Sequence, residues 1–344
     1  MQAVILAAGR STRTYPLTLT RPKPLLKVAN RPILEHNLDN LIWIADEAIL
    51  IVGYKKEMIK KHFGSSYKNI KIKYVHQKEQ LGTGHAAFLA EPYIKDKFIL
   101  MAGDDIYSRG DIVNCAKHQY SILVSKSKNP QNFGVITEKR GVLADFIEKP
   151  KKFVSGLVNT SLYTFNRKIF KYLKKVKKSE RNEYELPDAV KLLSKDEKVH
   201  CIKSKQWLPI GYPWDLLRAD IILRNGKNNI GKNAKINGNV NNSSVGDNCI
   251  INGDVKNSIV MDNATIDKDS SVSDSIIGEK VYFSGKIISK NNAASAVNGK
   301  KTTIGRFGAV IADNSKIKNV TISAGCRIWP GKLISNKKIN SDLT

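Results

Sequence analysis

Residues 3–13 read AVILAAGRSTR and join a short apolar run to a turn built of small residues. A continuous aliphatic run such as Ala3 to Leu6 is typical of a short strand that is buried on both faces of a sheet. The small residues that follow let backbone N–H groups approach a phosphate or a base closely. Arg13 offers a planar guanidinium and Lys23 a compact ammonium, which suit different phosphate oxygens. The start of the chain therefore predicts a sheet with an anion-binding loop after its first strand.

Residues 1–225 alternate apolar runs of strand length with amphipathic stretches of helix length, which is the pattern of an α/β fold. Beyond the first strand, the pattern predicts a helix over residues 33–44 and strands over residues 47–52, 70–75 and 98–101. We expect a Rossmann-like, mainly parallel sheet that helices cover on both faces. Such sheets bind ligands beyond the carboxyl ends of their strands, so functional residues should follow Leu6, Val75 and Met101.

After Asn225 the sequence changes to short apolar pairs separated by Gly, Asn, Asp and Ser, which predicts a second domain over residues 226–344. Aliphatic residues recur six positions apart in four groups, namely Val245 and Ile251; Val260, Ile266 and Val272; Ile304 and Val310; and Ile322, Ile328 and Ile334. A six-residue period of this kind is typical of a parallel β-helix. The period breaks at residues 289–301, which we expect to leave the coil as a loop.

The net charge of +26, from 57 basic and 31 acidic residues, favours polyanionic partners in general. The lysine clusters lack interleaved aromatic residues, so nucleic acid is not the favoured partner. No apolar run reaches the roughly 18 residues that span a bilayer, and the first residues do not resemble a signal peptide, so we expect a cytoplasmic protein without a membrane segment. The four cysteines are scattered and predict reduced thiols.

Several motifs occur in an order that resembles the sugar-1-phosphate nucleotidylyltransferases, in the version of the archaeal bifunctional enzymes. They are LAAGxxTRxxPxT at residues 6–18, RPKPL at 21–25, LGTGHA at 81–86, GDD at 103–105, FGVI at 133–136, EKP at 148–150, YELPD at 184–188 and GYPWDLL at 211–217. The resemblance implies a nucleotidyltransferase domain followed by a left-handed β-helix. It also implies that a sugar 1-phosphate attacks the α-phosphorus of a nucleoside triphosphate, with Mg²⁺ as cofactor. The LGTGHA segment favours UTP or dTTP with a hexose or N-acetylhexosamine 1-phosphate.

The resemblance also assigns roles to individual residues. Arg13 would bind the leaving pyrophosphate, Lys23 the reacting phosphate, and Asp104 the Mg²⁺ ion. The nucleotide would be held by Ala8, Gly9, Gln77, Gly82 and Thr83, and the sugar phosphate by Gly134, Glu148, Lys149 and Asn159. Catalysis of this kind consists mostly of positioning and charge neutralisation, so it requires no side-chain nucleophile.

The sequence departs from the pattern of this family at two places. Proline stands at position 209, where the family usually carries a second metal carboxylate, and proline offers no ligand. The acetyltransferase histidine of the bifunctional relatives is also missing, because the matching segment, residues 268–275, reads KDSSVSDS. A lysine that is protonated at neutral pH does not replace histidine as a general base. We therefore expect no acetyltransferase activity, and a structural or oligomerising role for the β-helix, in trimers or multiples of them.

Two hypotheses for the function stay open at this point. The retained Arg13, Lys23 and Asp104 favour an active nucleotidylyltransferase. Pro209 and the eroded acetyltransferase motif favour a catalytically weak paralogue that serves as a regulatory or scaffold subunit. Pyrophosphate release from mixtures of nucleoside triphosphates and sugar 1-phosphates distinguishes the two hypotheses.

Overall fold

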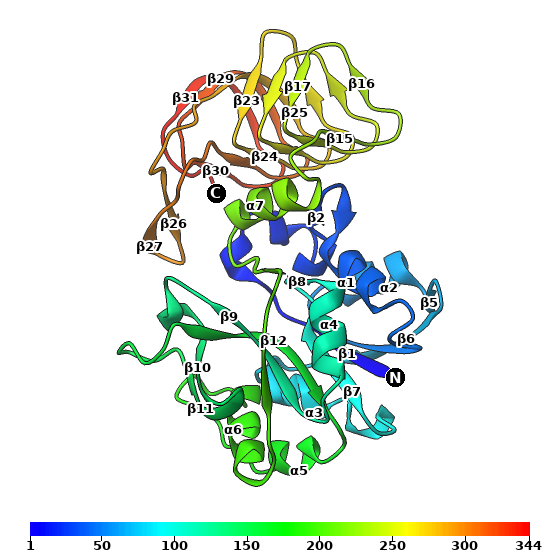
Figure 1. The fold of residues 1–344 in the computed structure, drawn as a ribbon. Coiled ribbons are helices and arrows are strands. Elements are labelled where there is room, and N and C mark those ends of the chain that lie inside the picture. Colours follow the sequence, from blue (N-terminus) through cyan, green and yellow to red (C-terminus); the bar gives the residue numbers. More distant parts are fainter. The chain divides into compact units, whose positions relative to one another are not determined.

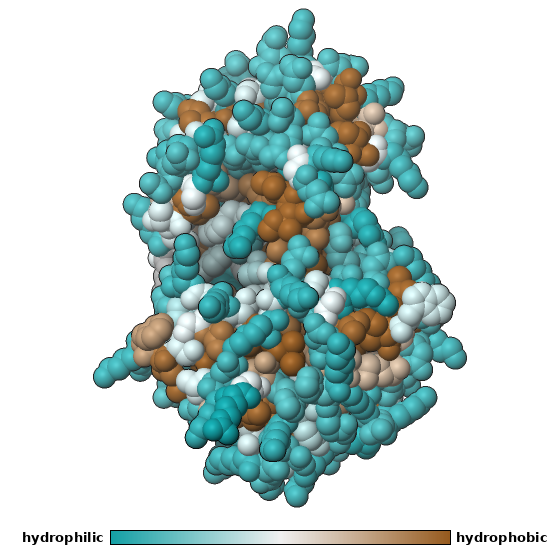
Figure 2. All heavy atoms as spheres, viewed as in Figure 1, coloured by the Kyte–Doolittle hydropathy of each residue, from teal (hydrophilic) through white to brown (hydrophobic). Residues whose placement is uncertain are grey.

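The structure is a computed structural model that describes residues 1–344 apart from the side chain of residue 300. The chain forms two compact units, one of residues 1–9 and 34–209, the other of residues 10–33 and 210–344. The predicted boundary after residue 225 stays a prediction. Among the described residues, no helix has the length and apolar character needed to cross a bilayer. Hydrophilic side chains cover most of the face shown in Figure 2.

Four parallel strands form one half of the sheet in the first unit, in the order β7 (Phe98–Ala102), β1 (Gln2–Ala7), β4 (Glu47–Val52) and β6 (Ile70–His76). These strands confirm the ones expected from the sequence. Their registers pair Ala7 with Val52 and Val52 with His76, so their carboxyl ends lie in line (Figure 1). The ten-stranded sheet continues on one side with β12, β9, β13, β11 and β10, and on the other with β5 (Ser66–Tyr67).

The other half of the sheet is more mixed than the sequence predicted. Its strands are β9 (Ser121–Lys126), β10 (Gly134–Lys139), β11 (Val142–Glu148), β12 (Leu157–Phe165) and β13 (His200–Lys203). Only β9 and β13 pair in parallel there, while β12 pairs antiparallel with both β7 and β9. A turn at Arg140 and Gly141, with φ of 52° and 76°, joins β10 to β11 as a hairpin. Two residues with positive φ are what a tight hairpin between twisted strands requires, and a connection this short makes the pair antiparallel.

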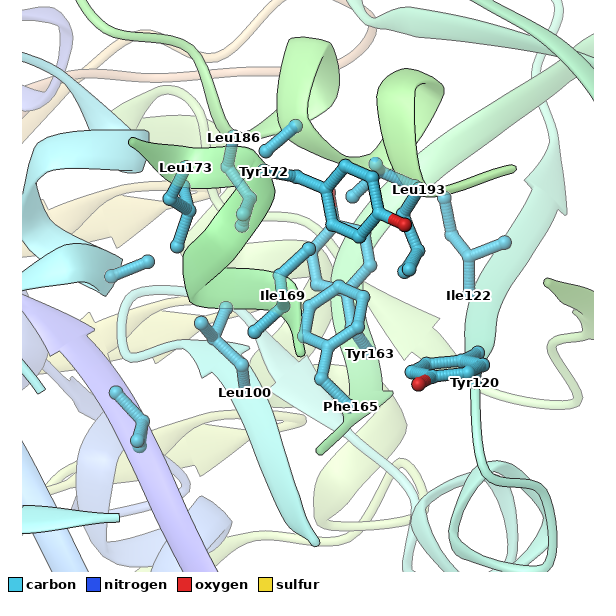
Figure 3. Packing of buried hydrophobic residues seen from close by; sticks show 14 of the residues in the cluster. Leu100, Tyr120, Ile122, Tyr163, Phe165, Ile169, Tyr172, Leu173, Leu186 and Leu193 are labelled. Carbon is cyan, nitrogen blue, oxygen red and sulfur yellow. The ribbon is translucent and has the colours of Figure 1, made fainter. Parts of the chain in front are cut away.

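Helices α3 (Thr83–Phe88), α5 (Ile169–Leu173) and α6 (Leu186–Asp196) pack together on one face of this sheet. Figure 3 shows Tyr172, Leu186 and Leu193 from these helices against Tyr163 and Phe165 of β12. Helix α4 (Arg109–Ala116) packs on β7, β9, β12 and β13 without joining that cluster, so it covers the other face. The predicted helix at residue 33 is α1 (Ile33–Leu41), and α2 (Lys56–Phe63) follows β4.

The second unit contains coils of short parallel strands, as the hexapeptide pattern predicted (Figure 1). One stack comprises β15 (Asn229–Ile230), β18 (Ser244–Val245), β21 (Ile259–Val260), β24 (Ile276–Ile277), β28 (Val310–Ile311) and β30 (Arg327–Ile328). A second sheet comprises β16 (Lys235–Ile236), β17 (Asn239–Asn241), β19 (Ile250–Ile251), β20 (Asp254–Lys256), β22 (Thr265–Ile266), β23 (Ser271–Ser273) and β25 (Tyr282–Ile287), with β29 (Lys316–Ile322) and β31 (Leu333–Ile339) beside it. The inward aliphatic side chains form a buried core along these coils.

The six-residue step holds in every coil at the corner between the first stack and the second sheet, whereas the next corner varies, with four residues from Ile251 to Val255 and six from Ile266 to Val272. Val245 pairs with Val260 in the next coil, a shift of 15 residues, and Val260 pairs with Ile277, a shift of 17. A strict hexapeptide on three faces would need 18 residues for each coil. Ile277 pairs with Ile311 because a hairpin of β26 (Ala294–Val297) and β27 (Lys300–Thr303) leaves the coil between them. This hairpin confirms the predicted break in the repeat.

The corner with the constant six-residue step carries a column of acidic residues, Asp247, Asp262, Glu279 and Asp313, which we term the acidic corner. The residue that follows each of these acids has positive φ, as at Asn248, Asn263, Lys280 and Asn314. Asparagine adopts this left-handed conformation more readily than most residues. The column therefore lies at a tight turn that is repeated from coil to coil.

The glycines of the Ile-Gly and Val-Gly pairs make room for this corner. A Cβ on Gly246 would lie 2.4 Å from Oδ1 of Asp262, and a Cβ on Gly278 would lie 2.5 Å from Oδ1 of Asp313. The aspartate of one coil thus folds over the glycine of the preceding coil. The repeated glycine that the sequence shows is a packing requirement of the aspartate one coil further on.

Residues 10–33 and the segment after Pro209 complete the second unit. They form three short 3-10 turns (Thr12–Thr14, Leu17–Leu19 and Lys23–Leu25), the ribbon of β2 (Lys27–Val28) and β3 (Arg31–Pro32), and helix α7 (Pro213–Leu223). All four cysteines of the chain are buried and free, as expected. Burial raises the pKa of the Cys115 thiol to about 12, so this thiol stays protonated near neutral pH.

Candidate active site

Residues directly after the parallel strands of the first unit come close to one another. The backbone oxygen of Ala8 accepts hydrogen bonds from Tyr54 N at 3.0 Å and from Gln80 Nε2 at 2.9 Å. A Cβ on Gly53 would lie 2.8 Å from that same oxygen, so only glycine allows this approach. Ala8, Gln77 and Asp104, which the sequence assigns to the site, follow β1, β6 and β7 in the structure, and their roles stay predictions.

Gln77 lies buried behind the loop that leads into α3. Its Nε2 donates to the backbone oxygen of Gly82 at 3.2 Å and lies 3.1 Å from Nδ1 of His85. Gly82 has a φ of +99°, and a Cβ there would lie 2.6 Å from the oxygen of Tyr184. The Oγ1 of Thr83 accepts from Leu186 N at 3.1 Å. The predicted nucleotide-binding residues 77, 82 and 83 therefore form one connected loop, with His85 as a structural partner.

Arg181 is a residue that sequence reasoning missed, and it connects this loop to the predicted sugar-phosphate residues. Its Nη2 lies 2.7 Å from Oε1 of Glu185 and 3.5 Å from Oε1 of Glu148. Glu185 directly precedes Leu186, whose N–H bonds to Thr83. The four-residue spacing of Arg181 and Glu185 beside the YELPD motif was the one signal that pointed to this pair.

The predicted sugar-phosphate residues meet around the ends of β10, β11 and β12. Gly134 pairs with Glu148 across the β10–β11 ladder, and a Cβ on Gly134 would lie 2.7 Å from Oε2 of Glu148. Lys149 has a φ of 44°, and its Nζ lies 3.7 Å from Oε1 of Glu148. Asn159 sits at an irregularity in β12, where its Oδ1 accepts from Ser161 N at 2.8 Å. Glu148 thus lies beside both Gly134 and Lys149, and the pairing of Val135 with Val158 brings the start of β10 next to Asn159.

Asp104 follows Gly103, whose N–H bonds to the oxygen of Leu6 at 2.9 Å. A Cβ on Gly103 would lie 2.9 Å from a methyl group of Ile5, so glycine lets β7 turn tightly beside β1. Next to Asp104, the Oδ2 of Asp105 accepts from Trp207 Nε1 at 3.0 Å. The carboxylate of Asp104 thus lies where the ends of β1 and β7 meet.

Position 209 lies in the immediate neighbourhood of these carboxylates. The two-stranded ladder of β8 (Ile106–Tyr107) and β14 (Trp207–Leu208) pairs Leu208 with Ile106, so one further step brings Pro209 opposite Asp105. Among the described residues there is no group of three or more His, Cys, Asp or Glu side chains arranged so that it could hold a metal ion. A carboxylate with few protein neighbours still fits Mg²⁺, which keeps several waters and substrate phosphates as ligands.

Tyr107 forms a buried support beneath this part of the site. Its hydroxyl donates to the oxygen of Thr160 at 2.6 Å, next to Asn159 in β12. Burial, followed by the charges of Asp105 and Asp104, raises the pKa of Tyr107 well above its usual value. Tyr107 therefore stays a neutral donor that ties the Gly-Asp-Asp segment to β12.

The two predicted cations, Arg13 and Lys23, belong to the second unit. The guanidinium of Arg13 lies 5.6 Å from the centre of the Tyr212 ring, which stacks on Trp214 at 4.9 Å. Lys23 is buried in a 3-10 turn. Burial raises the pKa of Asp215, while two backbone N–H groups and the charge of Lys23 act to lower it. Arg13 and Lys23 thus both adjoin the GYPWD motif, and their convergence with Asp104 stays a prediction.

Comparison with known proteins identifies the family of the chain. The family model of nucleotidyl transferases matches residues 2–225, and that of the GlmU-like C-terminal hexapeptide matches residues 228–292. The bifunctional protein GlmU of Methanocaldococcus jannaschii is 40% identical over 247 residues, which cover 70% of this chain and 60% of that protein. The chain thus spans about 60% of the length of the GlmU relatives that it matches.

Two further proteins resemble the first part of the chain. The UTP–glucose-1-phosphate uridylyltransferase AglF of Haloferax volcanii is 39% identical over 231 residues, which cover 64% of this chain and 95% of that protein. A crystal structure from Bacillus anthracis is described as a glucose-1-phosphate thymidylyltransferase in complex with sucrose. Its TM-score is 0.59 and its sequence identity is 27%, and the match covers 65% of this chain and 95% of that protein's chain. With a family model matched over more than half of its length, the chain belongs to the nucleotidyl transferase family.

Proposed function

We propose that this protein is a sugar-1-phosphate nucleotidylyltransferase that takes UTP or dTTP and a hexose or N-acetylhexosamine 1-phosphate. The observation that carries the proposal is the continuous contact from the loop of Gln77 and Thr83, through residues 181–186, to Glu148. Two binding regions that the motifs assign to different halves of the product are thereby connected in one unit. The match to a uridylyltransferase over 95% of that protein's length supports the same reaction.

The residues take the following roles in this reaction. A phosphate oxygen of the sugar 1-phosphate forms a bond to the α-phosphorus as the bond from that phosphorus to the bridging oxygen breaks, and pyrophosphate leaves. Arg13 neutralises the leaving pyrophosphate and Lys23 the reacting phosphate. Asp104 would hold a Mg²⁺ ion, which supplies charge neutralisation to the phosphates. Gly134, Glu148, Lys149 and Asn159 would orient the sugar phosphate, and Ala8, Gly9 and Gln77 the nucleotide.

The direct test is a matrix of four nucleoside triphosphates against a panel of sugar 1-phosphates, with and without Mg²⁺, scored by pyrophosphate release. We expect turnover with UTP or dTTP that requires Mg²⁺. The variant Asp104→Asn removes the proposed ligand and should lower the rate by about a hundredfold or more, whereas Asp96→Asn, on the loop before β7, serves as the matched control. Nucleotide binding without any turnover would refute the proposal and favour a regulatory or scaffold subunit.

Pro209 provides a second test, because that position lies one ladder step beyond Leu208, opposite Asp105. If the missing carboxylate limits the rate, Pro209→Asp should raise Mg²⁺-dependent turnover and lower the Mg²⁺ concentration needed for half the maximal rate. Asparagine has nearly the same shape as aspartate but carries no charge. Pro209→Asn should therefore leave both quantities near those of the wild type. Equal effects of the two substitutions would contradict this account.

For the β-helix we propose a structural and oligomerising role without acetyltransferase activity. The six histidines of the sequence all lie at or before residue 200, so the described coils contain no imidazole to serve as a general base. In place of the relatives' motif stand residues 268–275, in which Asp269 forms a turn with a φ of 59°. Incubation with acetyl-coenzyme A and glucosamine 1-phosphate should release no free thiol, and light scattering tests for the proposed trimers.

A further inference from the structure

The acidic corner of the β-helix holds the segment that carries the predicted phosphate-binding cations. Lys27 Nζ forms an ion pair with Asp262, and the guanidinium of Arg21 forms ion pairs with Glu279 and Asp313. In addition, Thr20 Oγ1 donates to Oδ2 of Asp313 at 2.6 Å. All of these residues belong to the second unit. Three successive acids of the acidic corner, Asp262, Glu279 and Asp313, thus bind residues 20–27.

The two oxygens of each corner aspartate have separate tasks. Oδ1 of Asp262 accepts from Asp247 N at 3.0 Å, and Oδ1 of Asp313 accepts from Glu279 N at 2.8 Å. These bonds join one coil to the next and fix the aspartate within the β-helix. Oδ2 of the same side chain points to the segment and pairs with Lys27 or Arg21. The β-helix therefore presents a row of rigidly held carboxylate oxygens.

Burial makes the central pair strong. The side chains of Arg21 and Asp313 are 9% and 5% exposed, so little water competes for them. Burial alone would lower the pKa of Arg21, but the hydrogen bonds and charges of Glu279 and Asp313 raise it above its usual value. Just beyond the segment, Asn30 Nδ2 donates to the oxygen of Val245 at 2.8 Å. The segment is thus fixed to the β-helix at both ends, with Lys23 between them.

We propose that the β-helix is a positioning element of the nucleotide site, acting through Asp262, Glu279 and Asp313 on the segment that carries Lys23. This proposal rests on the proposed function, because it assigns Lys23 to the reacting phosphate. Lys23 follows Arg21 by two residues, so a shift of the backbone at Arg21 also displaces the backbone that carries the Lys23 side chain. Catalytic groups need placement within about 0.5 Å, which a buried ion-pair network provides and a free surface loop does not. The three acids are positioning residues that contact no substrate.

The test compares Asp313→Asn with Asp247→Asn. Asparagine keeps Oδ1 as an acceptor, so the bond between coils survives, while the oxygen that faces the segment becomes an amide. Asp247 is the matched control, because its Oδ1 accepts from Lys232 N at 2.7 Å in the same manner and no contact with residues 10–33 is seen for it among the described residues. We expect kcat/KM for the nucleotide to fall at least about tenfold in Asp313→Asn and less than about twofold in Asp247→Asn.

A double-mutant cycle of Lys27→Met, Asp262→Asn and the variant with both substitutions tests whether misfolding, rather than the lost ion pair, causes a loss of activity. If the two side chains act through their mutual contact, the double variant should lose no more activity than the worse single variant. Fully additive losses would overturn the assignment of this pair.

Hydrogen exchange supplies a readout that does not depend on activity. The amides of Leu25 and Leu26 bond to the oxygens of Pro22 and Lys23, so a loosened segment should exchange these amides faster in Asp313→Asn and not in Asp247→Asn. Unchanged exchange in Asp313→Asn overturns the proposal, whatever happens to the rate. If the wild type turns over no substrate, the proposed function fails, while the exchange experiment still decides whether the acidic corner positions the segment.

Discussion

Replacement of Arg21 by methionine tests the strength of the acidic corner. Methionine keeps most of the aliphatic length but leaves Asp313, which is 5% exposed, with an uncompensated charge. Removal of one partner from a buried ion pair costs about 3–5 kcal/mol. Asp313 keeps its bonds from Thr20 and from Glu279 N, and Glu279, at 27% exposure, is partly hydrated, so we expect the lower end, about 3 kcal/mol. In a unit of roughly 160 residues this loss lowers Tm by about 6–12 °C.

The assay is differential scanning calorimetry of the wild type, Arg21→Met, and a triple variant that adds Glu279→Gln and Asp313→Asn. The triple variant should recover much of the loss, because the cost comes from stranded carboxylates rather than from lost packing. A Tm of Arg21→Met within about 2 °C of the wild type would refute the buried-pair reasoning. A triple variant less stable than the single one would show that the corner contributes net attraction.

The other predictions concern packing and pH. Gly278→Ala should destabilise the β-helix strongly, by about 2 kcal/mol or more in chemical denaturation, because a Cβ there would lie 2.5 Å from Asp313 Oδ1; Gly305→Ala, where a Cβ meets no atom within 4 Å, should have a far smaller effect. Burial, and then the charge of the stacked His200 ring, lowers the pKa of His118. Since the folded pKa is depressed, the stability from neutral His118 is fully present above the unfolded pKa of about 6.5 and is lost as pH falls through the lower folded value. The difference in Tm between pH 7.5 and pH 5.5 should therefore shrink in His118→Gln, and an unchanged difference would contradict the assignment.

The apolar runs at residues 3–6, 47–52 and 98–101 and the alternating stretch at 70–75 were sufficient to predict the parallel strands, because their short length and their alternation with helix-length stretches favour a covered sheet. The antiparallel half was not predicted. Its hairpin depends on Arg140 and Gly141 in left-handed conformation, and an Arg-Gly pair is a far weaker turn signal than Asn-Gly. Similarly, the sequence showed a six-residue period but not that only the corner between the first stack and the second sheet keeps it in every coil, since the coils adjust their length elsewhere.

The candidate site was predictable where a residue type carries its own chemistry. Gln77, Gly82, Thr83 and Glu148 were found from motifs, and the structure connects them. Arg181 was missed because its link to the sugar-phosphate residues comes from Glu148, 33 residues away in the chain, and the four-residue spacing to Glu185 alone does not reveal that link. The ion pair between Asp313 and Arg21 joins residues that are 292 positions apart, and the sequence did not predict it either.

The hairpin that leaves the coil between Ile277 and Ile311 has a practical use. Its tip is Asn298 and Gly299, with φ of 49° and 75°, and a Cβ on Gly299 would touch nothing within 4 Å. Foreign sequence spliced in at this tip would lengthen the excursion and leave every stacked pair in register. A fluorescent or affinity label at this point would therefore report on the intact protein, with the aliphatic core and the ion pairs of Arg21 with Glu279 and Asp313 both undisturbed.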